Sequence, residues 1–181
     1  MHLKKFSLKK FSLRQSALAL TLVALGTVTA PLWAVANGSG LTIFSGVAGD
    51  KQLNYRMDFG GNPNGWDRYR LYIPKKKMKL AVAQFVIDYP NYFDGKFDPK
   101  SIELYVNKKK VAIQEAKWDE ENAFIEIYPG EPVPAGTDVE IHLSNVRNPR
   151  SNGMYYFNCR VQTAGDIQLL RDLGTWILEI S

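Results

Sequence analysis

The chain has 181 residues, with 23 lysines and arginines against 18 aspartates and glutamates, and a formal net charge of +5. Five of the basic residues and none of the acidic ones fall within the first 36 residues, so residues 37–181 carry no net charge. This balance argues against a nucleic-acid-binding function, which needs a basic field that belongs to the folded domain.

Residues 1–36 have the layout of a secretory signal peptide. A basic start between Lys4 and Arg14 precedes an apolar run at about residues 17–28, and Ala34 and Ala36 form an A-x-A cleavage pattern. An uncleaved anchor is the alternative, because residues 16–36 are long enough to span a bilayer. We expect an exported chain in which residues 37–181 form a single domain.

Period-two alternation of apolar and polar residues runs through most of the chain after residue 40. It predicts half-buried strands, and residues 80–87, apolar on both faces apart from Gln84, predict a central strand. The predicted strands are residues 41–47, 53–59, 69–73, 80–87, 102–106, 111–115, 123–128, 139–143, 155–161 and 176–180. Nine or ten short strands favour an all-β, immunoglobulin-like β-sandwich, with a small closed barrel as the second choice.

Loops that follow successive strands of a sandwich must alternate between its two ends. This rule places IPKKKMK (73–79), NKKK (107–110), PGEPVPAG (129–136) and TAGD (163–166) at one end. It places GGNPNGWD (60–67), YPNYFDGKFDP (89–99), WDEEN (118–122) and RNPRSNG (147–153) at the other. Each segment is rich in residues that favour turns.

The inventory of reactive side chains is small, because residues 37–181 contain one histidine, His142, and one cysteine, Cys159. A single cysteine forms no intramolecular disulfide. The alternation predicts an outward-facing His142 and a Cys159 buried as a small hydrophobic residue. We therefore expect no transition-metal site, no catalytic residue and no cofactor. A calcium site built from carboxylates is a weaker alternative.

Seven short segments form a distinctive set: YRLYIP (69–74), AVAQF (81–85), YPNYFDGKFDP (89–99), PVPAGT (132–137), NP (148–149), GMYYF (153–157) and LGTW (173–176). Together they resemble a family of secreted cyanobacterial proteins, the domain-of-unknown-function family DUF2808, and the resemblance covers about residues 66–180. It implies export to the periplasm, the outer envelope or the thylakoid lumen. The family has no assigned activity, so the resemblance implies no catalytic residue.

The loop arrangement collects two lysine runs at one end of the predicted sandwich. These seven lysines are Lys75, Lys76, Lys77, Lys79, Lys108, Lys109 and Lys110. Each lysine near an anionic membrane contributes about 1 kcal/mol to binding, so we expect weak, salt-sensitive contact with an anionic surface. The competing interpretation is a solvated turn, since charge runs are usually exposed faces.

Aromatic and acidic residues gather at the opposite end. The candidate ligand contacts there are Trp66, Tyr89, Tyr92, Phe93, Asp94 and Trp118. Rings beside carboxylates and amides suit a glycan or a protein partner. The competing interpretation is that the long loops fold their rings inward to close the sandwich.

Together these features predict a non-enzymatic interaction or accessory module of the cyanobacterial envelope or thylakoid lumen. Its partner would be an envelope protein or glycan, with no nucleic acid. The alternative is a carbohydrate- or calcium-dependent surface protein that uses the aromatic and acidic loops.

Overall fold

Strands dominate the computed structural model, which describes residues 46–165 and 170–181 as parts of one compact unit, Gly38–Ser181. The predicted signal peptide and most of the predicted strand at 41–47 lie outside the described residues. Gly46 and Val47, at the end of that strand prediction, lie in a bend. None of the described residues belongs to a helix long and apolar enough to cross a membrane.

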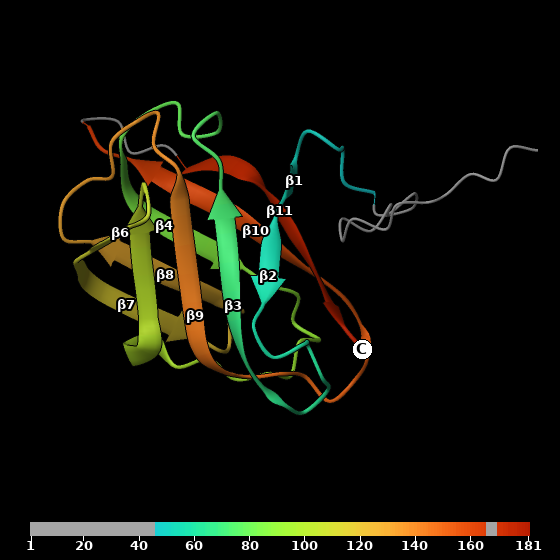
Figure 1. Ribbon diagram of the computed structural model, residues 1–181. Coiled ribbons are helices and arrows are strands. Elements are labelled where there is room, and N and C mark those ends of the chain that lie inside the picture. Colours follow the sequence, from blue (N-terminus) through green and yellow to red (C-terminus); the bar gives the residue numbers. More distant parts are fainter. Residues whose placement is uncertain (1–45, 166–169) are drawn as a thin grey trace, which may run out of the picture. The chain divides into compact units, whose positions relative to one another are not determined.

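The strands form two sheets that face each other in two layers (Figure 1). The six-stranded sheet has the order β1-β11-β10-β4-β8-β7. Its strands are β1 (Gln52–Leu53), β4 (Val82–Asp88), β7 (Ile113–Asp119), β8 (Phe124–Pro129), β10 (Gly153–Thr163) and β11 (Leu170–Ile180). All pairs are antiparallel except β1 with β11.

The five-stranded sheet has the order β2-β3-β9-β5-β6 and is antiparallel throughout. Its strands are β2 (Tyr55–Met57), β3 (Trp66–Ile73), β5 (Ile102–Val106), β6 (Lys109–Val111) and β9 (Val139–Arg147). A short 3₁₀ turn, η1 (Pro99–Ser101), precedes β5. The predicted β-sandwich is confirmed, and the central strand predicted at 80–87 is β4, between β10 and β8.

Alternate side chains of both sheets fill one shared apolar interior, as the period-two pattern predicted. Trp176, Tyr69, Phe85 and Phe157 are its largest fully buried members. The polar ends of two rings find partners: the Tyr69 hydroxyl donates to Asn148 Oδ1 at 2.6 Å, and the Trp176 indole donates to a main-chain carbonyl of β3. This satisfies the polar groups that burial would otherwise leave unpaired.

Two segments predicted as single strands, residues 53–59 and 111–115, each belong to both sheets. Asn54 alone separates β1 from β2, and Ala112 alone separates β6 from β7. Alternation continues through each crossing because both sheets face the same interior, so the pattern did not reveal the change of sheet. The first prediction also ran too far, since Phe59 is 61% exposed.

Hydrogen bonds between loops confirm the predicted sorting at the end that carries the lysine runs, here called the lysine end. Val82 and Val133 exchange main-chain hydrogen bonds, and the Gly136 amide donates to the Met78 carbonyl. The Ala164 amide donates to the carbonyl of residue 81. The loops that follow β3, β8 and β10 therefore lie together.

The opposite end, here called the ring-rich end, is joined in the same way. Lys96 and Arg147 exchange main-chain hydrogen bonds, the Asn64 amide donates to the Pro149 carbonyl, and the Tyr89 amide donates to the carbonyl of residue 123. The sequence prediction of four loops at this end is confirmed. Each end is thus a set of mutually braced loops on a rigid frame.

The last strand begins earlier than the predicted residue 176, because the chain stays paired through a glycine. Gly174 has φ +142°, and a Cβ there would lie 2.2 Å from the Lys51 carbonyl oxygen. That close approach lets β1 join β11, where the Thr175 amide donates to the same oxygen at 2.8 Å. The LGTW segment is thus part of a strand.

We predict that Gly174→Ala destabilises the domain by more than about 3 kcal/mol, since the added methyl group collides with main chain that has no room to move. Gly136→Ala is the matched control, because Gly136 also has positive φ (+69°) but open space around it. The control should lower the free energy of unfolding by only about 1–2 kcal/mol, which is the cost of placing a residue with a side chain in the left-handed conformation. Urea unfolding measures both, and equal losses would contradict the steric account.

Candidate functional site

A groove opens at the lysine end between two loops and the start of β9. The β3–β4 loop contributes Lys76 and Lys77, and the β5–β6 turn contributes Lys108. Gly49, Asp50 and residues 52–54 line another side, and the groove has a volume of about 600 Å³. The structure therefore brings members of both lysine runs to one concave site.

Asp138 ties the two lysine-bearing loops together. Its Oδ1 accepts the Lys75 amide at 2.8 Å, its carbonyl accepts the Asn107 amide at 2.8 Å, and its amide donates to Asn107 Oδ1 at 3.1 Å. Asn107 and Lys108 have φ of 48° and 66°, as two-residue hairpin turns require. The lysine positions are therefore set by main-chain bonds rather than by side-chain contacts alone.

Carboxylates also line the groove and oppose its positive charge. Asp138 is engaged by the loop amide, and Glu140 lies 3.1 Å from the ring of His142. The Asp50 side chain forms no hydrogen bond with any described residue. Two of the three carboxylates are thus occupied by neighbours within the domain.

The lysine side chains are less engaged than the carboxylates. Lys77 donates to the main-chain carbonyl of Asp50. Among residues 46–165 and 170–181, the ammonium groups of Lys76 and Lys108 have no partner. Lys75 and Lys79 are exposed on the same loop. Within the described ranges, these four side chains are therefore not engaged in contacts that hold the loops together.

Lys109 and Lys110 belong to β6 rather than to the predicted NKKK loop, because the turn itself needs only Asn107 and Lys108. Lys110 pairs with Glu103 of β5 at 2.6 Å. This bond turns Lys110 away from the groove, so the predicted group of seven lysines is divided between two surfaces.

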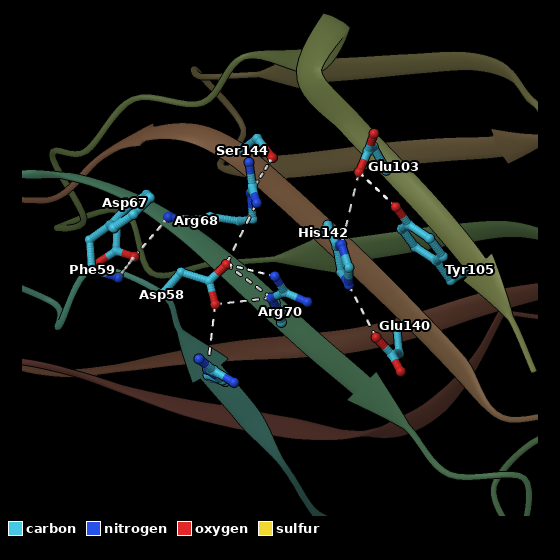
Figure 2. Close-up of polar contacts among 11 residues, drawn as sticks. Asp58, Phe59, Asp67, Arg68, Arg70, Glu103, Tyr105, Glu140, His142 and Ser144 are labelled. Carbon is cyan, nitrogen blue, oxygen red and sulfur yellow. Dashed lines mark hydrogen bonds and ion pairs between the residues drawn. The ribbon is translucent and has the colours of Figure 1, made fainter. Parts of the chain in front are cut away.

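The outer face of the five-stranded sheet carries a network of charged side chains around Asp58 (Figure 2). Arg70 Nε donates to both Asp58 oxygens, at 2.9 and 3.0 Å. Arg56 and Arg68 lie 3.4 and 3.7 Å from them. The Arg70 hydrogen bond, helped by the charges of all three arginines, lowers the pKa of Asp58.

His142 lies on this outer face, as predicted, but it is only 6% exposed. The Tyr105 ring covers it at 4.4 Å, Glu140 lies 3.1 Å from Nε2, and Glu103 lies 3.9 Å from Nδ1 (Figure 2). The nearby Ser144 hydroxyl accepts from Arg68 Nε. Both ring nitrogens thus face carboxylates, and within the described residues no hydrogen bond joins the Ser144 hydroxyl to His142, as a serine nucleophile activated by this histidine would require.

Cys159 is fully buried in the shared interior, as predicted. Burial raises the pKa of its thiol. Because the thiolate is the reactive form, a thiol in this environment is chemically inert.

At the ring-rich end, two of the predicted contact residues lie inside the domain. Tyr89 is 7% and Phe93 4% exposed, with their ring centroids 5.6 Å apart, and both pack against Phe157. Trp118 is half-buried and donates from Nε1 to the Tyr89 hydroxyl at 2.7 Å. These rings close the end of the sandwich, which is the structural interpretation of the aromatic pattern.

Two predicted rings stay on the surface. Trp66 and Tyr92 are each 62% exposed, and the Arg147 guanidinium lies 5.4 Å from the Trp66 ring centroid. Asp94 accepts from the amide and Nε of Arg150. The predicted six-residue contact surface is therefore reduced to separate exposed rings and an ion pair.

The acidic residues of this end bind their own loops. Asp67 is buried and accepts the amides of Phe59, Gly61 and Arg68. Asp98 accepts from the Ser101 hydroxyl. In the part of the chain that the structure describes, no three histidines, cysteines or carboxylates are grouped to hold a metal.

Sequence reasoning missed two features of the site. The arginine cluster has a signal in the alternation, since Arg68 and Arg70 fall two residues apart on β3, and Arg56 and Asp58 do so around β2. The role of Asp138 has no such signal. It depends on contacts with loops about 30 and 60 residues earlier in the chain.

Comparison with protein families identifies one family. A family model described as "Protein of unknown function (DUF2808)" matches residues 41–180. No curated protein matches the sequence.

Several solved structures are similar at low identity. BslA, described as a bacterial hydrophobin, has TM-score 0.45 and 11% identity over 72% of this chain and 97% of its own. The collagen-binding domain of a Staphylococcus aureus adhesin has TM-score 0.41 and 10% identity over 70% and 95%. An uncharacterised Nocardia farcinica protein, described as immunoglobulin-like, has TM-score 0.40 and 9% identity over 72% and 98%. The two sheets of the structure show the predicted β-sandwich.

We predict that Asp58→Asn lowers the free energy of unfolding by about 1–2 kcal/mol at pH 7, because charged hydrogen bonds to Arg70 are lost. The folded-state pKa is lowered, so the contribution is complete above the unfolded pKa of about 3.9 and disappears as the pH falls through the folded value. The difference between the two proteins should therefore vanish in acid. The control is Glu121→Gln at an exposed position, which should change the free energy of unfolding by less than about 0.5 kcal/mol. Urea unfolding across this pH range tests the account, which a pH-independent difference would contradict.

Proposed function

Because the chain belongs to the DUF2808 family, whose description assigns no activity, we propose its role from its surface. It is an exported, non-enzymatic accessory module of the cyanobacterial envelope or thylakoid lumen that contacts an anionic membrane through its lysine end. The observation that carries this proposal is the convergence of Lys76, Lys77 and Lys108 on one groove.

The geometry favours a membrane surface over a deep ligand site. Lys75 and Lys79 extend the charge of the groove along an exposed loop, so five lysines lie on two neighbouring loops. At about 1 kcal/mol each, the five lysines correspond to a dissociation constant of about 0.2 mM from charge alone. Such binding is weak, reversible and weakened by salt.

The absence of enzymatic chemistry is part of the proposal. The three features that support it are the carboxylate-flanked ring of His142, the engaged hydroxyl of Ser144 and the inert thiol of Cys159. A binding module needs none of these groups, whereas a hydrolase or transferase of the usual types needs a nucleophile beside a base.

The alternative, a carbohydrate- or calcium-dependent surface protein, stays a prediction. Its support is the exposure of Trp66 and Tyr92. Tyr89 and Phe93 are buried and Asp94 is paired with Arg150, so fewer of the predicted residues are available to contact a ligand.

We predict that replacing Lys75, Lys76, Lys77 and Lys108 by Gln weakens sedimentation with phosphatidylglycerol vesicles at low salt by about tenfold or more. The wild-type protein should sediment with these vesicles and stay in solution with phosphatidylcholine vesicles.

The matched control replaces Lys96, Lys100, Arg147 and Arg150 by Gln, which removes the same charge away from the lysine end and leaves β7 unchanged. It should weaken binding less than about twofold at moderate salt, where distant charges are screened. Equal losses in the two variants, or a wild-type protein that never sediments, would reject the lysine end as the membrane contact.

A further inference from the structure

Among the strands of residues 46–165 and 170–181, β7 is the longest at a sheet edge. The four strands at the edges of the two sheets are β1, β2, β6 and β7. The first three have two or three residues each, whereas β7 has seven. A long edge presents a row of unpaired amide and carbonyl groups to another chain.

Nothing in the described part of the chain covers that edge with hydrogen bonds. β7 pairs with β8 on one side. On the other side, no loop or side chain within residues 46–165 and 170–181 bonds to the main chain of residues 113–118. The strand lacks proline, and its one register shift, between Ile113 and Glu115, leaves residues 115–119 as a regular edge.

The charges along β7 alternate in sign rather than repelling a second strand. Glu115 and Lys117 are both exposed and lie on the same face, 3.0 Å apart. Ala116 lies between them in sequence and, like Trp118, packs against the interior on the opposite face.

We propose that two copies of this chain pair through β7, antiparallel and with Ala116 opposite Ala116 of the partner subunit. In this register Glu115 lies opposite Lys117 of the partner subunit, and Lys117 lies opposite Glu115 of the partner subunit. Opposite charges in directly facing positions stabilise a strand pair, and like charges destabilise it. The two six-stranded sheets then form one continuous sheet.

The same charges destabilise the alternative registers of the strand pair. Centring the pair on Lys117 places lysine opposite lysine and Glu115 opposite Asp119 of the partner subunit. Centring it on Glu115 places glutamate opposite glutamate, and a parallel pair in register places every charge opposite its own kind. Shifting the partner strand by one residue turns it over. The face with Glu115 and Lys117 in one copy then continues into the face with Ala116 and Trp118 in the other, so charged and apolar faces no longer match.

The pairing also covers apolar surface that one copy leaves half-buried. Ile113, Ala116 and Trp118 pack against the edge of the core without being fully enclosed. A second copy paired along β7 places its own strand beside these side chains. Its neighbouring side chains then remove more of their surface from water.

A charge-swap experiment tests the pairing by sedimentation velocity over a range of protein concentrations. The wild-type protein should form a concentration-dependent dimer. Glu115→Lys alone and Lys117→Glu alone should each raise the dimer dissociation constant by about tenfold or more, because each places like charges opposite one another. The double variant E115K/K117E should dimerise like the wild type.

Mixing the two single variants gives the sharpest result. Lysines 115 and 117 of one variant then face glutamates at 117 and 115 of the other, so a heterodimer should form where neither variant pairs with itself. Circular dichroism of each variant establishes that the fold is kept. A wild-type protein that stays monomeric, single variants that dimerise like the wild type, or a mixture that stays monomeric would each overturn the proposal. The outcome is independent of vesicle binding.

Discussion

Burial of the inner faces of two sheets against each other is the interaction on which the rest of the structure depends. It requires every strand to alternate, and it leaves the loops only the two open ends of the sandwich. The crossings at Asn54 and Ala112 join the sheets along both sides, so the interior is enclosed by main chain except at those ends. The loops are therefore divided between the lysine end and the ring-rich end.

The two ends use their polar residues differently. At the ring-rich end, buried Asp67 and the Arg150–Asp94 pair hold loops in place, and most rings complete the core. At the lysine end, Asp138 accepts the Lys75 amide and pairs with Asn107, while the ammonium groups of Lys76 and Lys108 have no partner among the described residues. Charges committed to structure are unavailable for binding, which is why the lysine end is the stronger candidate for an anionic partner.

The sequence was sufficient for the features that depend on period two. Strand positions and the sorting of loops follow from which residues alternate, and the central place of β4 follows from its apolar residues on both faces. The change of sheet at Asn54 does not, because side chains keep pointing to the same interior on both sides of it. The burial of His142 depends on Tyr105 of the adjacent strand, and such pairing is a matter of register between segments far apart in sequence. The contacts of Asp138 with Lys75 and Asn107 could not be predicted for the same reason.

The most direct test of the account is the set of amide shifts in the NMR spectrum of the labelled protein as bicelles containing phosphatidylglycerol are added. The account predicts that the largest changes fall on residues 75–79, Asn107, Lys108 and Asp138, which surround the groove. Largest changes at the Trp66 indole and in the loops of the ring-rich end, or no changes at all, would contradict it.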